Sequence, residues 1–112
     1  MAFEVHVDEE NDVIVLHLHG ALDHEATEFP SEVRRAVLTG KPLVVDLSAI
    51  ASVQSMGIGM LVEGFKAAKE SGRRMVFVGA RPQVRAVLNH TKLDTIFELI
   101  DSIDEAFDLL RR

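Results

Sequence analysis

Residues 3–7 and 13–19 alternate between two sides, with the apolar positions of one side at Phe3, Val5, Val7, Ile14, Leu16 and Leu18. Such alternation is typical of half-buried β-strands. The polar run of residues 9–12 separates the two stretches, so the pattern predicts an antiparallel hairpin. We expect Val7 to pair with Ile14, because this register keeps the apolar residues on one face.

Beyond the hairpin, apolar residues recur at helical spacing and short apolar runs lie between them. Four helices are predicted: one through residues 29–37 that stops at Gly40, one over 55–71, a short one opening at Pro82, and one through 103–110. Residues 43–47 and 75–78 are typical of strands buried on both faces, and 95–100 predict a weak edge strand. The order β-β-α-β-α-β-α-β-α predicts an α/β fold in which a mixed sheet, an antiparallel hairpin followed by parallel strands, packs with helices.

Length and composition narrow the classes of protein that this chain can represent. The 112 residues predict a single domain over 1–112. The absence of cysteine excludes disulfides and thiol nucleophiles. A net charge of −6 disfavours direct nucleic-acid binding and anionic membranes. Because the sequence also shows no long apolar run and no secretory signal, we expect a cytoplasmic protein without membrane insertion.

Two loops are expected to meet at the carboxyl ends of neighbouring strands, where open α/β sheets bind ligands and partners. One loop is residues 20–24 and the other is residues 52–59. Ser55 is expected to be the N-cap of the helix that follows. A phosphate on Ser55 would add negative charge at a helix start, which free amides tolerate but an acidic or tightly packed partner surface does not.

Other chemistries find weaker support in the sequence. The glycines at 57, 59 and 64 depart from the Gly-x-Gly-x-x-Gly spacing, so no nucleotide cofactor is predicted and Gly64 is expected to be a close helix contact. Asp46 lacks the acidic pair of a phosphorylated receiver and is expected to bond local amides at a strand end. No serine has a histidine base and carboxylate by motif, so the chain is not expected to be an enzyme.

The two histidines of the second strand, His17 and His19, share a strand face and could in principle hold zinc. No third ligand has convincing spacing, and Glu4 is expected to lie opposite His17 as a cross-strand partner. An exposed polar face is therefore the favoured interpretation. The sequence assigns no metal ligands.

Five segments together resemble a known family. They are Gly20-Ala21-Leu22-Asp23-His24, Val44-Val45-Asp46-Leu47-Ser48, Gln54-Ser55-Met56-Gly57-Ile58-Gly59, Val76-Phe77-Val78-Gly79 and Val84-Arg85-Ala86-Val87-Leu88. In this order they closely resemble a STAS domain of the anti-sigma factor antagonist class. The resemblance spans nearly the whole chain and implies a STAS-like fold.

In that family a serine at the start of a helix is phosphorylated by a partner that is both anti-sigma factor and serine protein kinase, and phosphorylation breaks the complex. The resemblance therefore implies regulation of sigma-factor-dependent transcription, with Ser55 as the phosphoacceptor. Two positions depart from the family pattern, because Gln54 replaces an aspartate and Met56 replaces a serine or threonine. The residues expected to contact the partner are Asp23, His24, Gln54, Met56 and Gly57.

Three other interpretations remain open at this point. The chain could dock on its partner without the usual switch, or with a different one. It could serve as a STAS subunit of a lipid-transport ABC complex and use the same face on an ATPase. It could also sense a small ligand or a nucleotide. The sequence does not decide whether the chain forms a homodimer.

Overall fold

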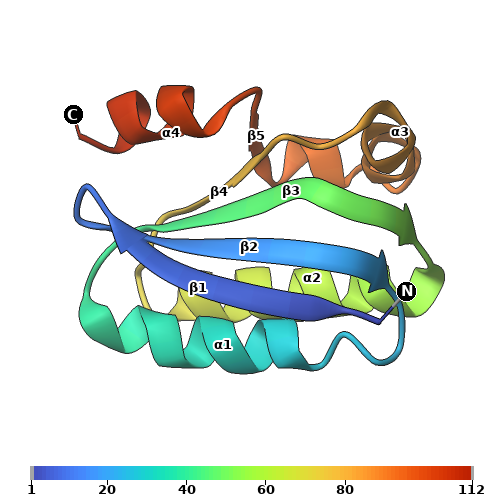
Figure 1. Ribbon diagram of the computed structural model, residues 1–112, viewed down its shortest axis with the longest axis horizontal. Helices are drawn as coiled ribbons and strands as arrows, with labels where there is room; N and C mark the ends of the chain where they lie inside the picture. Colours follow the sequence, from blue (N-terminus) through green and yellow to red (C-terminus); the bar gives the residue numbers. More distant parts are fainter. Residues whose placement is uncertain (1, 112) are drawn as a thin grey trace.

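The computed structural model describes residues 2–111, which form a five-stranded sheet with four α-helices and two short 3₁₀ segments (Figure 1). In chain order the elements are β1 (Glu4–Glu10), β2 (Val13–Leu22), α1 (Glu28–Ala36), η1 (Val37–Thr39), β3 (Leu43–Val53), α2 (Ser55–Glu70), β4 (Met75–Val78), α3 (Pro82–His90), η2 (Leu93–Thr95), β5 (Glu98–Ile100) and α4 (Ile103–Leu110). The strand order is β1-β2-β3-β4-β5, with the β1–β2 pair antiparallel and the others parallel. The predicted α/β fold with a mixed sheet is confirmed.

The sheet separates two hydrophobic cores. Helices α1 and α2 lie on one face and α4 lies on the other (Figure 1). On β2, Ile14, Leu16 and Leu18 point into the larger core, whereas Val13 and Val15 belong to the smaller core under α4. The first half of β2 therefore contributes apolar side chains to both cores. Its second half carries polar side chains on the α4 side.

Helices α1 and α2 approach each other closely at a glycine. A Cβ added to Gly64 would overlap the ring of Phe29, which is fully buried. The expected close helix contact at Gly64 is confirmed. This packing holds α2 closely against α1.

The register of the hairpin differs from the predicted one. Val7 pairs with Leu16, not with Ile14, and His17 lies opposite His6, not opposite Glu4. The reason lies in the turn, because Asn11 and Asp12 have φ values of 53° and 62° and so connect the strands in two residues. A two-residue turn lengthens both strands and shifts the pairing by two positions, which leaves every side chain on its predicted face.

Strand β3 is longer than its apolar run and reaches Val53. Its pairing with β2 is irregular between His17 and His19 and again between Gly20 and Ala21. The expected edge strand shortens to β5, because residues 93–95 form a 3₁₀ turn before it. Among residues 2–111, no helix is both long enough and apolar enough to cross a bilayer.

Candidate functional site: a docking surface at the start of α2

The loop after β2 and the start of α2 lie next to each other. Leu22 pairs with Val53 at the ends of β2 and β3. One residue further, the Gln54 amide donates to the Leu22 carbonyl at 2.9 Å. Asp23 follows Leu22 directly, and Ser55 follows Gln54. The structure therefore brings together the two loops that the sequence predicted to meet.

Ser55 is exposed and is the first residue of α2. The N-cap position belongs to Gln54, whose backbone is extended (φ −107°, ψ 166°) and whose side chain makes no capping hydrogen bond. The prediction of Ser55 as N-cap was wrong by one residue, because the Gln54–Leu22 bond continues the extended backbone one residue further than expected. The Ser55 side chain therefore does not cap the helix.

The first turn of α2 is electrostatically open to a negative group. The first helical bond runs from the Ile58 amide to the Gln54 carbonyl at 3.1 Å, so the amides of residues 55–57 have no carbonyl partner within the helix. The turn also contains no acidic side chain. Unpaired amides and the helix dipole both favour an anion at this position.

Asp23 and His24 shape the neighbouring loop. The Asp23 carboxylate is half-buried and accepts a hydrogen bond from the Glu25 amide at 2.9 Å, which holds the turn that leads toward α1. The His24 side chain is 67% exposed, with its Nε2 3.7 Å from the Glu25 carboxylate. Asp23 therefore stabilises its own loop, whereas His24 presents its ring to solvent.

The remaining predicted contact residues divide into exposed and buried ones. Gln54 is exposed and Met56 is 60% exposed, so both contribute to the surface around Ser55. Gly57 is buried, because it packs on the backbone of Leu22. Its contact with a partner stays a prediction, and its place against Leu22 lets this glycine support the surface from below.

One polar site was missed by sequence reasoning. Asp46 lies in the middle of β3, not at a strand end, and pairs with His17 of β2 in the register. Its Oδ1 accepts from the Ser48 amide at 3.0 Å, as predicted for a local amide, and its Oδ2 lies 2.8 Å from His17 Nδ1. Only the β2–β3 register, which the sequence does not reveal, brings these two side chains together.

The surroundings of Asp46 lower the pKa of its carboxyl. Burial raises the pKa of its carboxyl, but hydrogen bonds from the Ser48 amide and hydroxyl, and from His17, outweigh burial and hold the pKa below its ordinary value. The same carboxyl lies directly against the His17 ring.

Comparison with known proteins finds relatives of this chain. The sequence pattern of the STAS domain family matches residues 4–106. A proposed anti-sigma factor antagonist from Thermotoga maritima is 35% identical over 66 residues, which make up 59% of this chain and 58% of that relative. The match thus spans little more than half the length of the curated relative.

Solved structures extend the likeness to the whole fold. The crystal structure of a proposed anti-sigma factor antagonist from Thermotoga maritima has a TM-score of 0.85 and 28% identity, and the match covers 96% of this chain and 95% of that one. An anti-sigma factor antagonist from Mycobacterium paratuberculosis has the same TM-score and 26% identity, with 99% and 96% covered. Since the family pattern covers nearly all of the described chain and the architecture agrees, this chain belongs to the STAS domain family.

Proposed function

We propose that this protein is an anti-sigma factor antagonist and that it docks on a serine-kinase-type anti-sigma factor. The docking surface consists of Asp23, His24, Gln54, Ser55 and Met56, and is called the α2-start surface below. The observation that carries this proposal is the exposed Ser55 on the first turn of α2, beside the loop that follows β2. The likeness to anti-sigma factor antagonists supports the class of partner.

Phosphorylation of Ser55 is the proposed regulatory step. A phosphate would bring about −1.5 to −2 charges to this surface. The unpaired amides of the α2 first turn accept such a charge, so the fold would be retained. A partner surface that packs against Ser55 would instead have to bury the added charge, which is costly. The modification would therefore break the complex and leave the protein folded.

The exposed neighbours of Ser55 adapt this surface to its partner. Gln54 offers a neutral amide, which donates and accepts hydrogen bonds but supplies no carboxylate. Met56 offers a flexible apolar side chain that fits irregular partner surfaces. At positions 54 and 56 docking therefore rests on apolar contact and neutral hydrogen bonds, and the kinase must orient the Ser55 hydroxyl without an adjacent acidic group at position 54.

The decisive experiment combines capture of the partner with matched variants. The wild-type protein is immobilised, incubated with extract of its own cells, and the bound proteins are identified by mass spectrometry. We expect a kinase-like anti-sigma factor, whose affinity is then measured with purified components. Ser55→Asp should weaken this binding at least tenfold, whereas Ser31→Asp, at an exposed serine of α1, should leave it unchanged. Equal binding by Ser55→Asp and wild type would contradict the proposed surface.

The phosphorylation step has its own readout. Incubation with the captured kinase and ATP should add one phosphate to wild type and none to Ser55→Ala, as measured by intact mass. Binding without any phosphorylation would support docking and refute the proposed regulation by phosphorylation of Ser55. Capture of an ABC ATPase with its permease would instead favour a subunit of a transport complex.

A further inference from the structure

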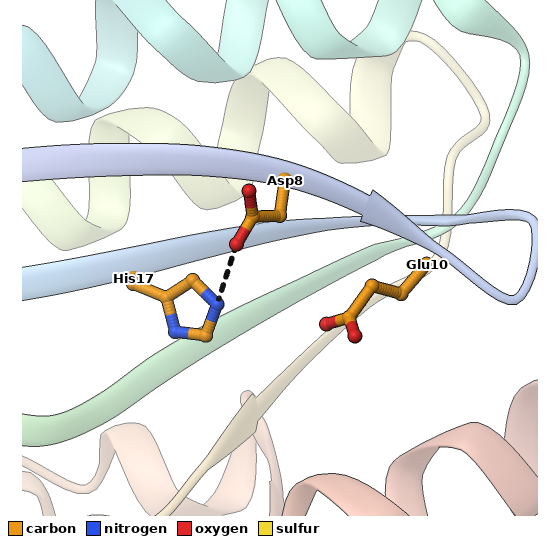
Figure 2. A group of neighbouring side chains, drawn as sticks. All are labelled: Asp8, Glu10 and His17. Atoms are coloured by element: carbon orange, nitrogen blue, oxygen red, sulfur yellow. Dashed lines mark ion pairs between the residues drawn. The ribbon is translucent and has the colours of Figure 1, made fainter.

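Three side chains with metal-binding groups converge on the α4 side of the sheet. Asp8 and Glu10 project from β1 and His17 from β2, and each offers one ligand atom within 4.8 Å of the others (Figure 2). Asp8 and Glu10 are exposed and His17 is partly buried, so the cluster is open to solvent on one side. The two-residue turn of the hairpin produces this arrangement, because it places Asp8 diagonally across from His17.

The His17 ring is held in one orientation from behind. Its Nδ1 lies 2.8 Å from Asp46 Oδ2, and this contact fixes the direction in which the ring points. The other nitrogen, Nε2, then faces the Asp8 carboxylate at 3.5 Å. A cation held between Nε2 and the Asp8 carboxylate would have both groups as ligands. A carboxylate behind a ligating histidine is a recurrent arrangement at protein metal sites.

Distances and charge also suit a bound cation. Two ligands held at about 2.1 Å in a tetrahedral site lie roughly 3.4 Å apart, close to the 3.5 Å between His17 Nε2 and Asp8 Oδ2. Glu10 offers a carboxylate oxygen within 4.8 Å of the Asp8 and His17 ligand atoms. Within residues 2–111 no lysine or arginine forms an ion pair with Asp8, Glu10 or Asp46. In the described chain, the ion-pair partner of Asp8 and Asp46 is thus the His17 imidazole itself, not a lysine or arginine.

We propose that Asp8, Glu10 and His17 bind one divalent first-row transition-metal ion, for which Zn²⁺ is the probe, and that Asp46 positions His17. The imidazole ligand favours such an ion over Mg²⁺ or Ca²⁺, which prefer oxygen ligands. With three protein ligands, a further position is open to water or to a partner's side chain. The site lies on a sheet face, apart from the α2-start surface, and is independent of the function proposed above.

The test uses the full chain without a histidine tag, after dialysis against a chelator. Zn²⁺ binding is measured by calorimetry and by competition with a chromogenic chelator. We expect one ion per chain, at least tenfold weaker binding for the double variant Asp8→Asn/Glu10→Gln, and a loss of similar size for His17→Gln. Both carboxylates are exposed, so the double variant should keep its fold, which circular dichroism verifies.

Matched controls come from the same strands and face. Glu4→Gln and His19→Gln remove one carboxylate and one imidazole outside the cluster, and should change Zn²⁺ affinity less than twofold. His6 and His19 are in edge-to-face contact, with ring centroids 4.9 Å apart, and are the rival ligands on this face. Loss of binding in His19→Gln would overturn the proposal. So would unchanged binding in the double variant, or no binding to wild type at millimolar Zn²⁺.

The positioning role of Asp46 has a separate readout. Asp46→Asn keeps the shape of the side chain but weakens its hold on His17, and is expected to lower Zn²⁺ affinity about tenfold or more. In NMR spectra the His17 ring nitrogens should shift on Zn²⁺ addition, with the larger change at Nε2. A change confined to the His6 or His19 rings would contradict the assignment.

Discussion

Gly57 lies directly against the backbone of Leu22. A Cβ added to Gly57 would overlap the Leu22 carbonyl group and would stand 2.8 Å from the Leu22 Cβ. Leu22 is fully buried and its carbonyl already accepts from the Gln54 amide, so neither part of it is free to move. The start of α2 is therefore held on the end of β2 by a close contact that only glycine permits.

This contact predicts opposite effects for two neighbouring glycines of α2. Gly57→Ala should destabilise the protein, because the overlap forces the helix away from β2. Gly59→Ala should stabilise it by about 0.5–1 kcal/mol, since alanine is the better helix former and nothing lies within 4 Å of the added Cβ. Urea unfolding of both variants measures the difference. If Gly57→Ala were more stable than wild type, α2 would be able to move away from Leu22 at little cost.

Gly57→Ala should also affect docking, since it displaces Ser55 and Met56 together. The expected result is weaker partner binding for Gly57→Ala at a temperature where the variant remains folded. Gly59→Ala is again the control and should bind like wild type. Unchanged affinity for a destabilised Gly57→Ala would show that the position of the helix start is unimportant for docking.

Ser55→Asp and Ser71→Asp form a second matched pair, at the two ends of α2. Both serines are exposed. A carboxylate at the helix start interacts favourably with the dipole, so Ser55→Asp should raise the free energy of unfolding by about 0.3–1 kcal/mol. Ser71→Asp places the same charge at the C-cap and should lower it by a similar amount. Destabilisation by Ser55→Asp would mean that a phosphate there disturbs the fold.

The Arg74–Glu98 pair predicts a dependence of stability on pH. Arg74 makes two hydrogen bonds to the Glu98 carboxylate, at 2.9 and 2.8 Å, and these hold the Glu98 pKa below its ordinary value of 4.5 against the opposing effect of burial. Because the folded pKa is the lower one, the stabilisation is present above pH 4.5 and is lost as pH falls through the folded pKa.

Glu98→Gln should therefore be less stable than wild type at pH 7, and the difference should vanish in acid. Both side chains are more than 40% exposed, so we expect the difference to be below about 1 kcal/mol and to shrink in 1 M salt. Unfolding curves at several pH values measure it. A difference that grows as pH falls would have the wrong sign for this pair.

Replacing a buried leucine, Leu61, and an exposed one, Leu38, should affect stability very differently. Leu61 projects from α2 into the larger core and is 0% exposed, whereas Leu38 is 85% exposed. Leu61→Ala should lower the free energy of unfolding by about 2–5 kcal/mol, because it leaves a cavity. Leu38→Ala should change it by less than about 0.5 kcal/mol. Similar losses in both variants would contradict this account of the core.

Much of the fold was predictable because it depends on local patterns. The alternation of β2, the helical spacing in α2 and α4, and the stop at Gly40 each follow from the side chains of one segment. Errors arose where two segments meet. The hairpin register depended on how Asn11 and Asp12 turn, and the length of β3 depended on pairing with β2, which continues beyond the apolar run.

The candidate site divides in the same way. Ser55 at a helix start and the nearby Asp23 were predictable, since both follow strands whose ends meet at one edge of the sheet. The burial of Gly57 was not, because it depends on how closely α2 approaches Leu22.

The sequence by itself determined the order of the elements, their buried faces and the loops that could carry a partner, because these depend on side-chain periodicity and on topology. The tertiary structure decided which side chains from different strands face one another. Asp8, His17 and Asp46 lie on three different strands and meet only through a two-residue turn on one side and parallel strand pairing on the other. A register shift of two residues preserves every face but changes every partner, and for this reason periodicity could not reveal that cluster.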